Sequence, residues 1–151
     1  MSKSQESFEN ARIGFKNFAG AEGPFNKAGD RSFHIFLDDA RAAQLEADGW
    51  NVKYPRPNEN IAVEEDTREP HMEVSLSYKF YPPKVVLISG QNMTVLEESE
   101  LDMLDWAEIE NVDIVIRPYS WSVNGKSGIK AYLKAMYVTI RTDAFSEKYG
   151  I

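Results

Sequence analysis

The feature that most constrains the fold is a pair of long apolar and aromatic runs joined by Asn124-Gly125 near the C-terminus. The segment, residues 112–140, reads VDIVIRPYSWSVNGKSGIKAYLKAMYVTI. Asn-Gly readily adopts the positive φ values that a two-residue hairpin turn needs. The sequence therefore predicts a long antiparallel β-hairpin, around which the rest of the chain is expected to be organised.

The second arm of this hairpin alternates between two kinds of side chain. One side of the strand is apolar and is predicted to pack on the core, with Ile129, Ala131, Leu133, Ala135 and Tyr137. The other side presents an aromatic ring between two ammonium groups, from Lys130, Tyr132 and Lys134. Met136 follows in the register of this second set, which indicates that the outer face becomes buried further along the strand.

The length and composition are those of one compact domain, residues 1–151. Of the 151 residues, 42% are hydrophobic, which is enough to bury a core. Residues 1–10 and 142–151 are predicted to be loose ends, and the acidic, proline-bearing segment 55–70 to be a mobile loop. No stretch resembles a membrane span or an apolar signal-peptide core, so a cytoplasmic protein without a membrane partner is expected.

The residue patterns that most enzyme and metal sites require are missing. The chain has no cysteine, and its two histidines lie far apart in the sequence, so no disulfide and no metal site are expected. Asp102, Asp105 and Glu108 could gather carboxylates on one helical face, but a solvated face explains them more simply. There is no P-loop, no Rossmann glycine pattern, no HExxH and no GxSxG. The sequence therefore predicts a protein without catalytic residues or cofactors.

The net charge of −7 is distributed unevenly along the chain. Acids concentrate in residues 59–73 and 97–110, whereas residues 111–151 contain three acids against six lysines and arginines. Because salt screens charges over roughly 8–10 Å, the local field decides what a surface binds. An acidic protein of this kind can still present one positive groove.

Outside the hairpin, the sequence predicts short strands and two helices. Strands are expected at residues 11–18, 32–37, 50–54, 71–81 and 84–89, and a turn at 90–92 leads into residues 93–96. One helix is expected after an N-cap at Asp38 and before Gly49, and a second at residues 97–108. The side chains expected to face the core from these helices are Ala42, Ala43, Leu45, Leu101, Leu104 and Trp106.

The order of these elements predicts a mainly β protein with two short helices, an OB-fold-like five-stranded barrel with an N-terminal extension. The helix at 97–108 would lie between the third and fourth barrel strands. The first barrel strand is either 32–37 or 50–54. A two-sheet β-sandwich with small helices is the competing architecture.

Aromatic and cationic residues are expected together on the outer face of this barrel. They are Lys79, Tyr81 and Lys84 near one strand junction, Arg117, Tyr119 and Trp121 on the first hairpin arm, and Lys130, Tyr132 and Lys134 on the second. Rings that stack on bases, combined with cations that neutralise phosphates, are typical of single-stranded nucleic-acid binding.

Simpler interpretations exist for several of these residues. Tyr119 and Trp121 fit a core or a surface position equally well, and the lysines could merely keep an exposed strand soluble. Phe18 and Phe33 flank the glycine-rich segment 19–30, and Phe25 lies within it. Packing of these rings that holds the loop on the core is favoured over a base-stacking role for Phe25.

Three stretches of the chain carry a family resemblance. They are FKNFAGAEGPFNKAGDRSF, GWNVK and IRPYSWSVNGKSGIKAYLKAMYV. Together, from about Phe15 to Ile140, they resemble phage-encoded single-stranded-DNA-binding proteins of replication and recombination modules. The resemblance implies an OB fold and a protein that coats exposed strands without sequence preference. The chain ends in SEKYGI rather than in an acidic tail with an apolar tip, so recruitment of partners through the C-terminus is not expected.

Two hypotheses of different classes follow. The first is a non-enzymatic OB-fold protein that binds single-stranded DNA, with replication or recombination proteins and a second copy of the chain as further partners. The second is an acidic protein–protein interaction module, or a DNA mimic that inhibits a host protein. A structure in which Tyr132 and Trp121 pack inside would favour the second.

Overall fold

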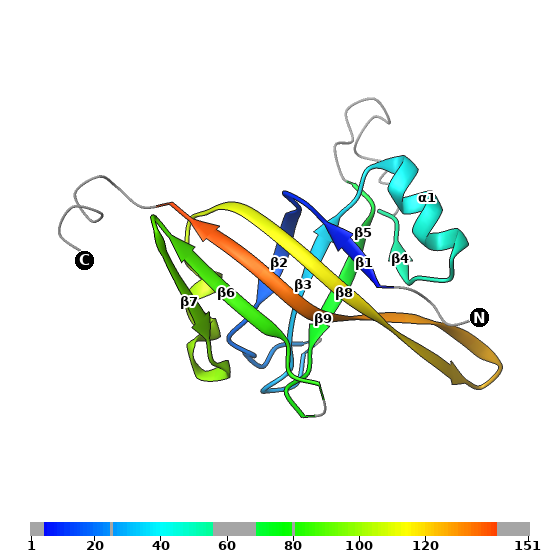
Figure 1. The fold of residues 1–151 in the computed structure, drawn as a ribbon. Coiled ribbons are helices and arrows are strands. Elements are labelled where there is room, and N and C mark those ends of the chain that lie inside the picture. The colour runs from blue at the N-terminus through cyan, green and yellow to red at the C-terminus, as the bar shows by residue number, and fades with distance from the viewer. Residues whose placement is uncertain (1–4, 25, 56–68, 80, 142–151) are drawn as a thin grey trace, which may run out of the picture.

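Nine strands and two helices make up the part of the chain that the computed structural model describes, residues 5–24, 26–55, 69–79 and 81–141 (Figure 1). The strands are β1 (Glu6–Phe8), β2 (Arg12–Asn17), β3 (Arg31–Phe36), β4 (Val52–Lys53), β5 (His71–Leu76), β6 (Lys84–Ser89), β7 (Asn92–Leu96), β8 (Ile109–Val123) and β9 (Lys126–Ile140). The helices are α1 (Asp39–Ala47) and η2 (Glu98–Asp105), a 3-10 helix. The predicted class, mainly β with two short helices, is confirmed.

The strands form one mixed sheet with OB-like connectivity. Its main path runs β1-β8-β9-β5-β3-β2, while β4 pairs with β5, and β6 pairs with both β7 and β9. The pairs β5–β9 and β6–β9 are parallel, and the others are antiparallel. When β2, β3, β5, β8 and β9 are counted as strands one to five, their order is 1-2-3-5-4, that of an OB barrel. As predicted, a helix, η2, lies between the third and fourth of these strands.

Two details of the predicted barrel were wrong. The sheet is open rather than a closed five-stranded barrel, although the start of β2 reaches β8 through a hydrogen bond from Ala11 N to the Val112 carbonyl oxygen (2.7 Å). The first barrel strand is β2, because the strand predicted at 32–37 pairs with β2 on one side and β5 on the other. The candidate at 50–54 forms only the two-residue β4.

The N-terminal segment is more ordered than predicted. Within the supposed loose end, β1 pairs with β8, and Phe8 is buried. Arg41 of α1 lies 4.5 Å from the centre of the Phe8 ring and forms an ion pair with Glu6 (3.0 Å). Burial of Phe8 explains why this end is held. Residues 1–4, 56–68 and 142–151, together with Phe25 and Phe80, lie outside the described residues, and so do the predictions that rest on them.

The hairpin forms as predicted. Asn124 and Gly125 have φ values of +51° and +78°, and β8 and β9 pair along their whole length. The segment after α1 is hydrogen-bonded to the hairpin. Ile129 N donates to the Gly49 carbonyl oxygen (3.0 Å), and Asn51 N donates to the Ile129 carbonyl oxygen (3.1 Å). This support fixes the position of the outer face of β9.

A β-bulge changes which residues of β9 face the core. The register shifts at Val115–Ile116, so that Lys134 is the extra residue between the paired Leu133 and Ala135. Beyond the bulge Met136 and Val138 are buried, whereas Ala135 and Tyr137, predicted to face inward, are outside the core. The burial of Met136 is confirmed, but its cause is the reversal of the strand at the bulge.

The core is formed by the inner faces of the strands together with one side of each helix. Phe18 and Phe33 stack there at 5.3 Å, as expected for residues that hold the loop 19–30 on the core. The predicted inward residues Ala42, Leu45, Leu101 and Leu104 are fully buried. Ala43 and Trp106 are exposed, contrary to prediction. Trp106 is the C-cap of η2, where the helix has already ended.

Candidate nucleic-acid interface

The outer face of the sheet carries polar and aromatic residues in rows that cross the strands. One row, through successive register partners on β2, β3, β5, β9 and β8, consists of Asn17, Ser32, Ser75, Tyr132 and Arg117. The row beside it contains Gly14, His34, Glu73, Lys130 and Tyr119. The sheet thus gathers residues from both hairpin arms and from β5 on one surface.

Tyr132 lies at the centre of a cluster of rings and cations. The Arg117 guanidinium lies 5.4 Å and the Lys130 ammonium 5.1 Å from the centre of its ring. Tyr119 meets the same ring edge-on at 5.8 Å. Arg117 also lies 4.7 Å from the Tyr81 ring and donates a hydrogen bond to the Tyr81 carbonyl oxygen (3.2 Å). These contacts join five of the nine predicted site residues, and we call them the tyrosine cluster.

An open groove of about 650 Å³ begins beside the tyrosine cluster. The residues that line it on β3, β5 and β9 and after β5 include Ser32, Glu73, Ser75, Lys79, Lys130 and Tyr132. The predicted strand 71–81 ends early, at Leu76, so Tyr78 and Lys79 leave the sheet and form a wall. Burial raises the pKa of the Tyr78 hydroxyl, so this side chain stays uncharged beside Lys79.

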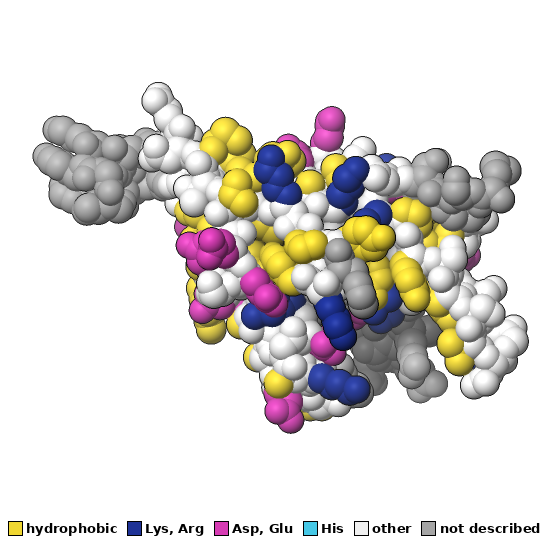
Figure 2. All heavy atoms as spheres, turned by 60° about the horizontal axis from the view of Figure 1, so that its bottom comes forward, with side chains coloured by type: hydrophobic (Ala, Val, Ile, Leu, Met, Phe, Trp, Pro, Cys, Tyr) yellow, Lys and Arg dark blue, Asp and Glu magenta, His cyan; other side chains and the backbone are white. Residues whose placement is uncertain are grey.

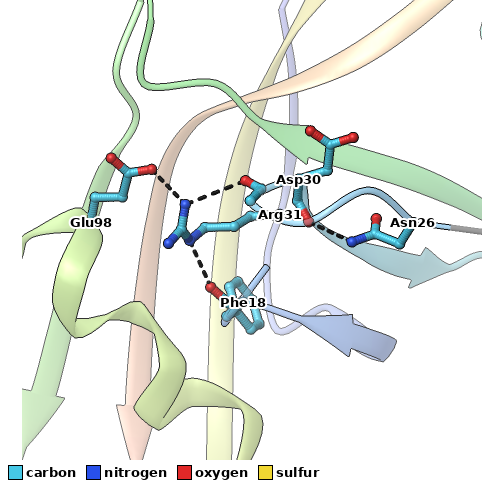
Figure 3. Close-up of polar contacts among 6 residues, drawn as sticks. Phe18, Asn26, Asp30, Arg31 and Glu98 are labelled. Atoms are coloured by element: carbon cyan, nitrogen blue, oxygen red, sulfur yellow. Dashed lines mark hydrogen bonds and ion pairs between the residues drawn. The ribbon is translucent and has the colours of Figure 1, made fainter. Parts of the chain in front are cut away.

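A second wall of the groove is held in place by Arg31 (Figure 3). Its Nε donates to the Phe18 carbonyl oxygen (2.9 Å), and its guanidinium forms an ion pair with Glu98 of η2. In the same wall, the Asn26 side-chain amide donates to the Asp30 carbonyl oxygen (3.0 Å). The loop before β3 therefore has a fixed position beside the groove.

The other predicted site residues lie around the tyrosine cluster. Trp121 lies nearer the hairpin turn and covers Gly128, where an added Cβ would be 3.0 Å from Trp121 Cζ2. Lys84 stands opposite Ala135 at the start of β6, and Lys134 is exposed in the bulge. Lys79 is exposed at the groove. None of the nine predicted residues belongs to the core, which answers the open question for Tyr119 and Trp121.

A second group of rings on the same face was missed from the sequence. The Phe15 ring lies 5.2 Å from that of His34, 5.5 Å from that of His71 and 5.9 Å from that of Phe36. The two histidines approach to 2.8 Å between their Nδ1 atoms. We call these four residues the Phe15 platform. The alternation of His34 and Phe36 with buried residues along β3 was the signal that could have revealed part of it.

Most charged side chains in and beside the groove lie near groups of opposite charge. Glu73 lies with its carboxylate 3.6 Å from His34 Nε2. The hydrogen bond from His34 and the charges of Lys53 and Lys130 hold the pKa of Glu73 below its usual range. Figure 2 shows lysine and arginine side chains among hydrophobic ones, with scattered acids, at the end of the molecule where the β2–β3 and β5–β6 connections lie. This mixture is compatible with a polyanionic ligand that has flat bases.

Asp105, one of the carboxylates considered for metal binding, has another role. Asp105 accepts hydrogen bonds from the backbone N–H groups of Phe18 (2.8 Å) and Ala19 (3.0 Å), and so anchors the loop before β3. Within the described residues no three acids or histidines are arranged to hold a metal ion. Nor does any helix there have the length and apolar character needed to cross a membrane.

The fold and the outer face define an OB-like protein of the nucleic-acid-binding class, and solved structures share this fold. A C-terminally truncated single-stranded DNA-binding protein from bacteriophage Enc34 matches with a TM-score of 0.55 and 13% identity, over 92% of this chain and 87% of that one. The Enc34 protein in complex with ssDNA matches with a TM-score of 0.53 and 12% identity, over 93% and 89%. No curated protein sequence matches the chain.

A family model covers almost the whole sequence. Residues 2–151 match the family described as "Putative phage ssDNA-binding domain", and the chain belongs to this family. The resemblance read from the sequence is thereby confirmed. The chain is a single-stranded-DNA-binding protein of the phage type.

Proposed function

We propose that the chain binds single-stranded DNA across the outer face of β3, β5, β8 and β9, without sequence preference. Tyr132, Tyr119 and Tyr81 stack on bases, with Trp121 extending the contact along the hairpin. Stacking discriminates little between bases because each has a flat π-face. Arg117, Lys130 and Lys79 hold phosphates. Lys84 and Lys134 add positive charge where β6 meets β9.

The position of Tyr132 carries this proposal. Its ring lies within 5.4 Å of Arg117 and 5.1 Å of Lys130, at the edge of an open groove. A nucleotide presents a flat base and a negative phosphate a short distance apart, and this arrangement offers a partner to each. The ring–cation contacts also orient the cations before DNA arrives, which lowers the entropy cost of binding.

We infer the biological setting from the family. The protein is proposed to act without catalysis, to coat and protect exposed strands during phage replication or recombination, and to do so in the host cytoplasm as one OB-like domain spanning residues 1–151. Support comes from the family match to residues 2–151. Tyr132 and Trp121 lie outside the core, so the condition that would have favoured a DNA-mimic inhibitor is not met.

The proposal is tested by fluorescence titration with oligo-dT over a salt series. The logarithm of the association constant should fall linearly with that of the salt concentration, with a slope of about −0.7 for each phosphate held. Absence of binding at low salt, or an affinity indifferent to salt, would overturn the proposal. Tyr132→Phe, which keeps the ring, is the control for ring-removing variants and should bind like the wild type.

A further inference from the structure

We propose that the Phe15 platform is a second base-binding site, on the same strand path as the tyrosine cluster. The inference rests on the proposed function, because it extends the interface of one bound strand. It assigns base stacking chiefly to Phe15, with the rings of His34, Phe36 and His71 as its support.

The backbone at Phe15 turns a large apolar ring out into solvent. Phe15 is 66% exposed and has a φ of +47°, inside the irregular register between Gly14 and Asn17 of β2. A bulky residue at positive φ is an outlier, and such strained positions cluster where a protein contacts ligands. Bulges also occur where a side chain has to be re-aimed. Packing alone does not account for a phenylalanine held in this way.

The rings beneath Phe15 are fixed by close packing. The Phe36 ring lies directly over Gly14, where a Cβ would come within 2.6 Å of Phe36 Cε2. The His34 and His71 rings lie 4.9 Å apart and their Nδ1 atoms 2.8 Å apart. The platform is therefore preorganised, which favours binding because little side-chain freedom remains to be lost.

The platform is continuous with the groove. His34 is the register partner of Glu73, which lines the groove together with Lys130 of the tyrosine cluster. From β9 to β3 is two strand spacings, roughly 10 Å. A strand stacked on Tyr132 would reach Phe15 by crossing β5 and β3.

The charge around the platform favours a nucleotide over an apolar peptide. Lys53 is the register partner of His71 on the outer face and can meet a phosphate next to a base stacked on Phe15. The charge of the neighbouring acid, Glu73, is offset by His34, Lys53 and Lys130. These three residues hold the pKa of Glu73 below its usual range. A ring with a cation beside it is the same combination that the tyrosine cluster offers.

The test is the affinity of Phe15→Gly for oligo-dT of about 16 nucleotides, the upper end of the site size for one OB fold. Loss of one stacked base should weaken binding about fivefold to 150-fold. The midpoint of urea unfolding should not fall, because glycine adopts positive φ without strain. Phe15→Leu, which keeps apolar bulk but not the flat ring, should also weaken binding. The matched control is Met93→Ala on β7, 65% exposed in the wild type, which should bind normally.

Tyr132→Ala is titrated in parallel so that two kinds of failure can be told apart. If Tyr132→Ala binds weakly while both Phe15 variants bind like the wild type, the platform is refuted and the proposed function stands. If the wild type does not bind at all, both fail. If Phe15→Gly proves unstable, Phe15→Leu decides, and wild-type affinity in that variant refutes the platform.

Discussion

Two regions of the molecule expose aromatic side chains, and they differ in what surrounds them. On the outer sheet face, Tyr132 lies beside Arg117 and Lys130. After η2, Trp106 is 89% exposed and directly follows the acidic Asp105. A ring attracts a polyanion only where nearby cations hold the phosphates, whereas acids repel them. The charges around an exposed ring, more than its exposure, therefore select the ligand.

The largest expected effect on DNA affinity is that of removing the Tyr132 ring from the outer sheet face. Tyr132→Ala should weaken binding of oligo-dT by about 1–3 kcal/mol, the range for one stacked base. Tyr132→Phe should retain the affinity, since it keeps the ring. Fluorescence titration at constant salt measures both. Equal loss in the two variants would instead assign the effect to the hydroxyl group.

The next effect concerns the cations beside the ring. Lys130→Ala should reduce the steepness of the salt dependence by about 0.7 in the log–log slope, because one phosphate contact is lost. The matched control is Arg141→Ala, which removes an exposed cation that pairs with Glu108 near η2 (3.0 Å). Its slope should equal that of the wild type. A similar change of slope in both variants would mean that the binding surface is not confined to the sheet face.

A smaller effect on stability is expected from the histidines of the sheet face. Burial, His34 and Lys53 together lower the pKa of His71. Below an unfolded-state pKa of about 6.5, the folded state therefore binds fewer protons than the unfolded state. The free energy of unfolding should fall as the pH is lowered from about 7.5 towards 5, above the range in which carboxylates titrate.

Urea unfolding of the wild type and of His71→Gln at both ends of this range measures the contribution. The titratable groups around His71 are His34 on β3, Lys53 on β4 and Glu73 two residues along β5. The pH dependence should be shallower in the variant. A variant that loses stability as steeply as the wild type would show that His71 does not resist protonation.

The smallest expected effect concerns Trp106, which follows η2. Trp106→Ala should leave the affinity for oligo-dT unchanged, because this ring follows Asp105 at the end of η2 and is not among the residues that line the groove. The change in binding free energy should stay within about 0.5 kcal/mol, the usual range for surface substitutions. A loss of affinity as large as that of Tyr132→Ala would contradict the statement that the charges around a ring decide whether it binds DNA.

Local signals in the sequence were sufficient for most of the fold. Asn124-Gly125 predicted the hairpin turn because its backbone preference is intrinsic, and the N-cap of α1 at Asp38 accepts from Arg41 N as that residue type suggests. The bulge at Lys134 was not predictable in the same way. It reverses the inward and outward sides of β9 through pairing with β8, which the alternation of one strand does not encode.

The two parts of the candidate site differ in the same way, because one could be predicted from local sequence signals and the other could not. The tyrosine cluster was predicted because Arg117, Tyr119, Lys130 and Tyr132 belong to one hairpin whose register the turn fixes. The Phe15 platform was not, since its residues come from β2, β3 and β5 and its leading ring depends on a positive φ at Phe15. Contacts between strands distant in sequence, and strained backbone, leave little trace in a single sequence.

The most direct measurement is photo-crosslinking of the protein to oligonucleotides that carry halogenated uracil, with the crosslinked residues mapped by mass spectrometry. Single-stranded DNA held on the outer sheet face predicts crosslinks at Tyr132 and its neighbours Tyr119 and Tyr81. Crosslinks confined to Trp106 and the η2 end, with none on the hairpin, would contradict the assignment of that face to DNA.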